Sequence, residues 1–390
     1  MGGSVIAQMK IHIGITNGIG LLLSLSLLLG GQYRLLGYIG FFGALSLFVI
    51  HNSCTFIFDR MNRSIVFLAI AVLIGFVVSL FHRNSLIDSL GDMLRYYLIF
   101  FIIFVIYNSK VNSKQIDSIF RSFIYSFFVL LLVCYFQVGM KVKLLETNTL
   151  VTTQIGSDIF LVICAILYRK KKGAMSALAA IGLIVVEYLA ESRTALFASL
   201  LLIILYCSFN IMKREFKHAN CLFWLWIVLC LAIPAIYVYI YTSKYNSMIE
   251  MLFLKYTGHR FFSGRQFMWT RAFDVFVSNS ILGKGVGFRL DTSNLYKGAS
   301  EGMSVHNFFL YVLLQMGIIG FALFCYMFYT FWKRYSKIGT NQANCMRAFL
   351  LAVLLQQTFS LGLVSGKMGF AFVCWFLMAI GAKGNENNCG

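Results

Sequence analysis

Long apolar runs follow one another along almost the whole 390-residue chain and constrain its fold more than any other feature. Runs of about 17–25 apolar residues are long enough to cross the hydrocarbon core of a bilayer as helices. Only 12% of the residues are charged, about half the share of an ordinary globular domain. A transmembrane β-barrel would show short segments of alternating polarity instead. The sequence therefore predicts an all-α integral membrane protein with a single polytopic domain, residues 1–390.

The apolar runs predict about twelve transmembrane helices, separated by short loops and one long polar loop. Their expected ranges are 12–30, 35–52, 65–82, 93–108, 119–138, 153–168, 174–190, 193–211, 221–242, 317–332, 347–362 and 368–383. Lys and Arg collect in alternate loops, as at 169–172, and this bias is typical of cytoplasmic loops. We therefore expect both termini in the cytoplasm and the long loop, 243–305, on the outer face.

The formal net charge of +19 would suggest nucleic acid as the partner of a soluble protein. Here the positive-inside rule accounts for much of that charge, so we expect membrane lipids and no nucleic acid as partners. None of the ten cysteines lies in the long loop, which favours small apolar residues over a disulfide framework. Metal-ligand spacings such as CxxC or HExxH are absent from the sequence, so no metal or other cofactor is expected.

Two helices are expected inside the long loop. The segment from Met248 to Lys255 is apolar and should lie on the membrane surface. The segment from Ser263 to Ser280 is amphipathic, and Ser263 is its expected N-cap. Its apolar face should carry Phe267, Trp269, Phe273, Phe276 and Val277, while Arg265, Arg271 and Asp274 should point away from that face. A glycine-rich turn, 283–287, follows and offers backbone freedom at positive φ.

The long loop is basic, although the outer side of a membrane protein is usually poor in Lys and Arg. Its basic residues are Lys244, Lys255, Arg260, Arg265, Arg271, Lys284, Arg289 and Lys297, against the acids Glu250, Asp274, Asp291 and Glu301. One interpretation is a solvated loop near anionic lipid heads, because long loops escape the rule. The other is a phosphate or diphosphate site, because guanidinium groups match phosphate oxygens.

Three predicted helix starts favour the phosphate interpretation: Ser192-Arg193, Ser263-Gly264-Arg265 and Ser304-Val305-His306. Helix N-termini present free N–H groups and a partial positive charge, which attract anions. A cation placed there, as at Arg193 and Arg265, works against the helix dipole and suggests an anionic ligand. The same field would keep His306 neutral, as a general base requires.

Simpler roles remain open for each of these residues. Arg193 would form an ion pair with Glu191, Arg265 would reach lipid phosphates, and His306 with Asn307 would only cap a helix. Alternative bases are Glu187, Glu191 and His259. Arg95 lies inside a predicted span, where a charge is costly, and Asp92 is its expected structural partner.

These segments resemble the O-antigen polymerase and O-antigen ligase superfamily of bacterial membrane proteins. The resemblance covers roughly residues 187–335. It is carried by Glu191-Ser192-Arg193-Thr194-Ala195, by Ser263-Gly264-Arg265 with Trp269, by Gly283-Lys284-Gly285-Val286-Gly287, by His306-Asn307 with Phe309-Leu310, and by Gly317-Ile318-Ile319-Gly320.

The resemblance implies a membrane glycosyltransferase with a GT-C-like fold in the bacterial inner membrane. Its donor would be an undecaprenyl-diphosphate-linked glycan, and transfer at the periplasmic face would be inverting and metal-independent. Arg193 and Arg265 would hold the donor diphosphate, and His306 would activate the acceptor hydroxyl. Further substrate-binding candidates are Arg260, Arg289, Lys284 and Asn307.

The acceptor separates the two activities within this superfamily. A polymerase transfers the growing chain to another lipid-linked repeat unit, and a ligase transfers it to lipid A-core. The Ser-Gly-Arg segment with its tryptophan and the glycine turn resemble the polymerase more closely, and a chain-length regulator is a candidate partner. Outside this superfamily, a transporter of polysaccharide lipids and a non-catalytic envelope scaffold remain alternatives.

Overall fold

The computed structural model describes residues 2–30, 34–54, 59–139, 149–169, 174–189, 192–211, 219–258, 261–262, 264–290, 305–336, 340–364 and 368–384. In these residues the chain forms α1 (Gly2–Gly30), α2 (Arg34–His51), α3 (Arg60–Phe81), α4 (Leu86–Asn108), α5 (Ser113–Gly139), α6 (Thr149–Tyr168), α7 (Ala174–Leu189), α8 (Arg193–Ile211), α9 (Ala219–Thr242), α10 (Asn246–Thr257), α11 (Arg265–Ser278), α12 (Phe308–Ser336), α13 (Asn341–Gln357) and α14 (Met368–Gly384).

Each range predicted to span the membrane coincides with a helix. Within the described residues, six of these helices are long and apolar enough to cross a bilayer, namely α3, α4, α5, α8, α9 and α12. The structure therefore confirms an all-α membrane protein, while the full number of crossings stays a prediction. Several helices start earlier than expected, among them α1 at Gly2, α4 at Leu86 and α12 at Phe308, and α13 ends at Gln357 in place of 362.

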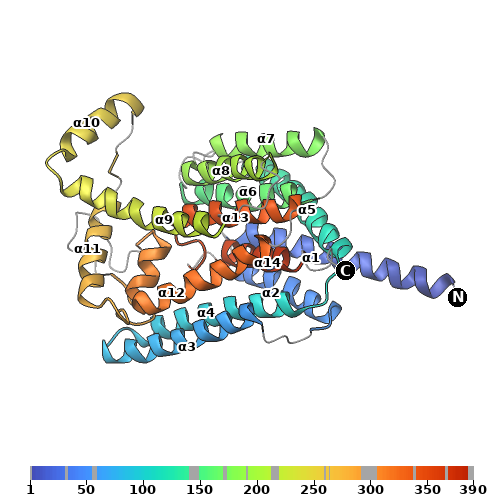
Figure 1. Cartoon of the computed structure of the whole chain (residues 1–390). Helices are drawn as coiled ribbons and strands as arrows, with labels where there is room; N and C mark the ends of the chain where they lie inside the picture. Colours follow the sequence, from blue (N-terminus) through green and yellow to red (C-terminus); the bar gives the residue numbers. More distant parts are fainter. Residues whose placement is uncertain are drawn as a thin grey trace.

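Helices α13 and α14 form the centre of the helical bundle. Most of their side chains are buried, as expected for helices surrounded by others, and Phe349, Leu350 and Trp375 are fully buried. Helices α6 and α8 pack against α13, and α2 and α4 pack against α14, so the central pair lies between two outer groups (Figure 1).

The outer helices expose apolar side chains on the faces that point away from this core. Phe67 and Ile70 on α3, like Leu225 and Val228 on α9, are exposed by half or more. Such a surface is unfavourable in water and favourable against lipid acyl chains. The fold thus has the apolar outer surface that a bilayer requires.

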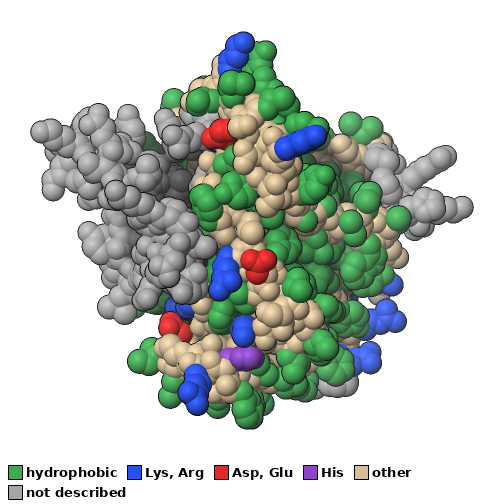
Figure 2. All heavy atoms as spheres, turned by 90° about the vertical axis from the view of Figure 1, so that its left-hand side faces the viewer, with side chains coloured by type: hydrophobic (Ala, Val, Ile, Leu, Met, Phe, Trp, Pro, Cys, Tyr) green, Lys and Arg blue, Asp and Glu red, His purple; other side chains and the backbone are tan. Residues whose placement is uncertain are grey.

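The two helices of the long polar segment lie together at one end of the molecule, where α9 leads into α10 (Figure 1). Helix α11 packs against α9 and the start of α12. A view of this end shows hydrophobic side chains over much of the face, with the described Lys and Arg side chains spread among them (Figure 2). Both expected loop helices are confirmed, with α10 at Asn246–Thr257 in place of 248–255.

The glycine turn after α11 is confirmed and tightly packed. Gly283, Gly285 and Gly287 all have positive φ, between 72° and 94°. The Lys284 N–H donates to the Leu314 carbonyl at 2.7 Å, and the Val286 N–H donates to the Gly75 carbonyl at 2.9 Å. The turn therefore joins α3 to α12, two helices that are far apart in sequence.

We expect Gly285→Ala to destabilise the fold by about 3 kcal/mol, because a positive φ costs about 1–2 kcal/mol and overpacking costs a similar amount. An added Cβ would lie 2.4 Å from the backbone of Ser79. The measurement is the thermal unfolding midpoint of the purified protein in detergent. Gly91→Ala is the matched control, because nothing lies within 4 Å of its added Cβ. Equal midpoints for the two variants would contradict the tight packing.

Candidate functional site

The candidate site is built around two consecutive backbone carbonyls where α13 ends. The carbonyl of Thr358 accepts a hydrogen bond from the Asn307 side-chain amide at 2.8 Å. The next carbonyl, of Phe359, accepts one from the Arg265 guanidinium at 3.4 Å. Unpaired carbonyls at a helix C-terminus carry partial negative charge and attract such donors. The structure thus brings together the predicted residue Arg265 and the predicted pair His306-Asn307.

Arg265 is the first residue of α11, within the first turn where the sequence predicted it, and the helix begins later than the expected start at Ser263. The N-cap is Gly264 in the left-handed conformation (φ 87°), not the expected Ser263, and no side chain caps this end of the helix. The guanidinium lies 5.7 Å from the ring centre of Phe359, within the range of a cation–π contact. Burial lowers the pKa of Arg265 from its ordinary value.

Among the described residues no carboxylate forms an ion pair with Arg265. Its guanidinium is half-buried and is held by a carbonyl oxygen and an aromatic ring. Removing a cation from water without an opposite charge is costly, so this position favours an anionic ligand.

Trp269 fixes α11 in place one turn after Arg265. Its side chain is fully buried, and its indole N–H donates to the carbonyl of Val305 at 2.8 Å. Its ring lies 5.1 Å from that of Tyr237 on α9. Because Val305 directly precedes His306, this bond couples the position of α11 to the start of α12.

The buried face of α11 matches the predicted one in part, because Trp269 is buried and Phe273 and Phe276 pack against the same cluster. Met268 and Ala272 are buried beside Trp269, whereas Val277, predicted on the apolar face, is 75% exposed. Arg271 and Asp274 are exposed as expected. Arg265 was expected to point away from the apolar face, and it instead turns toward the end of α13. The difference arises because α11 packs against α9 and α12 at once.

His306 is exposed and lies just before α12 in the left-handed region, with φ 49°. This conformation is strained for a residue with a Cβ, and it is less rare for histidine than for most residues. Asn307 follows as the N-cap and accepts a hydrogen bond from the Leu310 N–H at 2.9 Å. The turn therefore leaves the His306 side chain outside the helix while Asn307 closes the helix end.

Asn307 itself was predicted to bind substrate, and the structure gives it another role. Its side chain is fully buried, and both of its polar groups bond to the protein. It positions His306 by tying the start of α12 to the end of α13. A helix cap was one of the alternatives at this position.

Arg193 is exposed and is the first residue of α8, as predicted. Helix α8 runs antiparallel to α13, because the side chain of Asn344, near the start of α13, bonds to Phe209 and Asn210 near the end of α8. The start of α8 is therefore on the same side of the bundle as Thr358 and Phe359. Arg193 thus faces the same end of the bundle as Arg265 and His306.

Arg289 was predicted to support substrate binding, but it anchors the fold. Its two terminal nitrogens donate to the two carboxylate oxygens of Asp92 at 2.7 and 3.0 Å. Asp92 also accepts from Tyr311 and Gln315, at 2.6 and 2.9 Å, and from Arg95 at 2.7 Å. The expected pair of Arg95 with Asp92 is therefore confirmed within a larger cluster. Burial lowers the pKa of Arg289, and the bonds to Asp92 and Tyr311 more than reverse this and raise it.

Lys284, another predicted substrate residue, lies in the glycine turn. Its backbone carbonyl accepts a hydrogen bond from the Asn84 side chain at 2.8 Å. Burial, and then the charge of Lys284, lower the pKa of His82. Lys284 therefore lies close to His82 and Asn84, at the link between α3 and α4.

The remaining candidate residues either lie outside the described part of the chain or are buried in it. Arg260, with His259, Glu191, Ser263 and Ser304, lies outside the described residues. Glu187, an alternative base, is fully buried in α7 and accepts a hydrogen bond from Ser199 at 2.8 Å. Its carboxyl group therefore faces α8 and is out of reach of an external substrate.

Four residues that hold this end of the molecule together were not predicted, namely Thr358, Phe359, Tyr311 and Gln315. Tyr311 and Gln315 are spaced i,i+4 in an apolar helix, and polar residues at that spacing share one helix face. That pattern could have indicated a partner for Asp92. Thr358 and Phe359 contribute backbone carbonyls and a ring, and no sequence signal distinguishes them.

Comparison with known protein families adds an independent observation. Residues 177–325 match the family described as O-antigen ligase. This match supports the resemblance to the O-antigen ligase and polymerase superfamily, and it includes Arg193, Arg265 and His306. No curated protein matches the chain significantly.

The O-antigen ligase match begins within α7 and ends within α12. Thr358 and Phe359 on the C-terminal side and Asp92 on the N-terminal side therefore lie outside it. The structure connects these outlying residues to the matched region: Thr358 accepts a hydrogen bond from Asn307, Phe359 from Arg265, and Asp92 from Arg289.

We expect Asp92→Asn to destabilise the protein by about 3 kcal/mol, because it leaves Arg289 and Arg95 without their buried partner. Urea or thermal unfolding in detergent measures this loss. Asp88→Asn is the control: its carboxylate is more exposed and lies 3.7 Å from Arg289, so the loss should stay below about 1 kcal/mol. An equal loss in both variants would show that Asp92 is not the anchor.

We expect His306→Gly to be about 1 kcal/mol more stable than His306→Ala, because glycine adopts a positive φ without strain. Both variants remove the imidazole, so the comparison isolates the backbone contribution. The difference in thermal unfolding midpoint between them checks it. Equal midpoints would contradict the left-handed conformation at this position.

Proposed function

We propose that this protein transfers an undecaprenyl-diphosphate-linked glycan to an acceptor sugar hydroxyl at the outer face of the bacterial inner membrane. The observation that carries the proposal is that Arg265 and Asn307 bond to the consecutive carbonyls of Phe359 and Thr358, just after α13. A half-buried cation and the backbone next to an exposed histidine are thus held at the same helix end, within the segment that matches the O-antigen ligase family.

In the proposed reaction the His306 imidazole takes the proton of the acceptor hydroxyl. The acceptor oxygen then attacks the anomeric carbon from the face opposite the diphosphate, which inverts that centre. The bond from the anomeric carbon to the diphosphate oxygen breaks, and the lipid diphosphate leaves. Arg265 and Arg193 stabilise the negative charge that develops on it. No metal ion is required in this scheme.

Two acceptors fit this chemistry. We favour another lipid-linked repeat unit, which makes the protein an O-antigen polymerase, because the Ser-Gly-Arg segment and the glycine turn resemble that activity. The second candidate is a ligase that transfers the glycan to lipid A-core, and the description of the matching family favours it. A transporter of the same lipid is a weaker alternative, because the candidate residues gather at one end of the bundle.

We expect Arg193→Ala, Arg265→Ala and His306→Ala each to reduce glycan transfer by at least about a hundredfold, the usual size of a general-base or charge-stabilising contribution. The measurement is a gel of surface lipopolysaccharide from a strain lacking the protein and complemented with each variant, with membrane levels of the protein checked. Arg271→Ala is the control, because Arg271 is exposed on the same helix as Arg265.

The same gel distinguishes the candidate activities. Core with a single repeat unit in the null strain supports the polymerase. Bare core, with long chains accumulating on the lipid carrier, supports the ligase. An unchanged ladder in the null strain, or full activity in all three variants, would contradict the proposal.

A further inference from the structure

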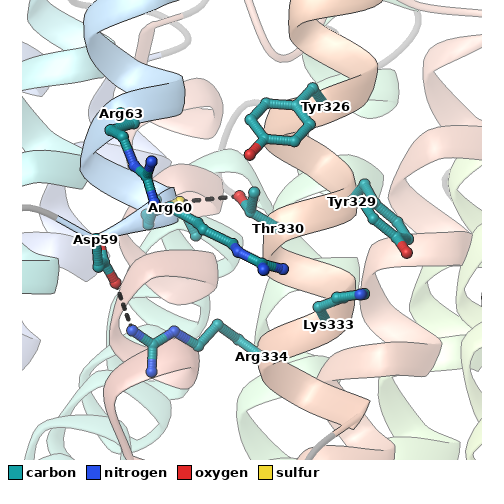
Figure 3. Close-up of a pocket in the computed structure, with 9 residues that line it drawn as sticks. Asp59, Arg60, Arg63, Tyr326, Tyr329, Thr330, Lys333 and Arg334 are labelled. Carbon is teal, nitrogen blue, oxygen red and sulfur yellow. Dashed lines mark hydrogen bonds and ion pairs between the residues drawn. The ribbon is translucent and has the colours of Figure 1, made fainter.

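A hollow lies between the start of α3 and the end of α12. It encloses about 430 Å³ and is lined by Arg60 and Arg63 from α3 and by Lys333 and Arg334 from α12. Figure 3 shows Arg60 extending from α3 toward α12, with the Tyr326 hydroxyl above it. The two helices thus line one hollow with four basic residues.

The hollow carries a strong positive charge. Its four basic residues face one acidic residue, Asp59, which leaves a net charge of +3 (four minus one). Asp59 is already engaged, because it bonds to Arg334 at 2.6 Å, accepts from Tyr107, and caps α3 through the Asn62 N–H at 3.0 Å. In the part of the chain that the structure describes, no carboxylate forms an ion pair with Arg60 or Lys333.

This hollow is separate from the candidate glycan-transfer site. Helix α12 begins at Phe308, beside His306, and reaches the hollow at Lys333 and Arg334 near its other end. The helix is kinked at Gly317, and the part from the kink to Arg334 is about 25 Å long at 1.5 Å per residue, close to the thickness of the hydrocarbon core of a bilayer. The hollow therefore lies at headgroup level on the opposite membrane surface.

The positive-inside rule accounts for basic residues at this surface, but not for their convergence. Loop cations that only set topology can point into water, whereas these four belong to two packed helices and line a cavity. Directly along α3 from Arg63, Phe67 and Ile70 are each 50% exposed. Phosphate-binding cations next to an exposed apolar surface match a molecule with an anionic head and acyl chains.

We propose that this hollow binds the headgroup phosphate of an anionic glycerophospholipid, of the phosphatidylglycerol class. Arg60 and Lys333 contact the phosphate from opposite helices, and the acyl chains lie along the exposed face of α3. Lys333 lies 5.2 Å above the ring of Tyr329, which holds its stem in place. Arg334 stays paired with Asp59 and shapes the floor of the site.

The first test uses the purified full-length protein in a neutral detergent. Native mass spectrometry measures bound phosphatidylglycerol, with phosphatidylcholine as the neutral lipid and inorganic phosphate as a soluble competitor. The test variant is Arg60→Gln with Lys333→Gln. The control is Lys110→Gln with Lys114→Gln, which removes two exposed cations on the same predicted membrane face outside the hollow.

We expect the test variant to bind phosphatidylglycerol about 25-fold more weakly, since each cation near an anionic headgroup contributes about fivefold. The control should change binding less than about threefold. Equal binding by the test variant and the unmodified protein, or an equal loss in the control, overturns the proposal. Binding of inorganic phosphate without selectivity for phosphatidylglycerol over phosphatidylcholine also overturns it, because the ligand would then be a free anion.

A second measurement avoids substitutions altogether. A phosphatidylglycerol analogue with a photoreactive headgroup is crosslinked to the unmodified protein, and the labelled peptides are mapped. Labelling of the segments 59–63 and 326–334 supports the site. Labelling confined to other segments overturns it, even if the variants fail to fold.

Discussion

The bidentate ion pair between Arg289 and Asp92 holds the polar end of this molecule to its membrane helices. Asp92 is almost completely buried on α4, where an isolated carboxylate would be very costly. Its two oxygens accept hydrogen bonds from Arg289, Arg95, Tyr311 and Gln315, so the charge is matched and the lone pairs are used. Because these donors come from α4, α12 and the segment between α11 and α12, one buried carboxylate fixes the relative positions of all three.

The geometry of the candidate site follows from that arrangement. Tyr311 lies one turn after Asn307 on α12, so the same helix end that is anchored to Asp92 also presents His306. Asn307 then ties this end to Thr358, and Trp269 ties α11 to Val305. The Arg265 guanidinium and the His306 backbone are thus both held by elements that cannot move independently. Such preorganisation is what electrostatic stabilisation of a leaving group requires.

Helix α12 connects the two functional surfaces that we propose. It is interrupted at Gly317, which has φ 60° and ψ −162°. The N–H of Ile318, beside this break, donates to the carbonyl of Ser280 at 2.8 Å, so the segment after α11 satisfies the backbone there. The kink lets the first part of α12 turn toward the site while the rest of the helix crosses to the basic hollow. A break of this kind is tolerated in a membrane helix when the protein itself supplies the missing hydrogen bonds.

Helix α11, the amphipathic helix of the polar segment, shows which features a local sequence pattern predicts and which it does not. Its existence follows from the spacing of apolar residues, although it begins at Arg265 and not after an N-cap at Ser263. Its buried face follows only in part, because Trp269 is buried as predicted, whereas Val277 is exposed and Met268 and Ala272 are buried. An apolar stripe predicts that some face is buried, but the neighbours that cover it decide which residues belong to that face. Here α9 and α12 cover it from two sides.

The sequence alone determined the class of fold, the approximate ranges of the helices, the glycine turn and the pairing of Arg95 with Asp92. These features depend on interactions between residues close in the chain, or on the cost of placing polar groups in lipid. Tertiary structure alone decided that Arg289 and Asn307 stabilise the fold, and that Arg265 and His306-Asn307 share the end of α13. Those contacts join residues about 50 to 200 positions apart, and their backbone acceptors, Thr358 and Phe359, have no side-chain signature. A backbone carbonyl acts through its position, and only packing determines that position.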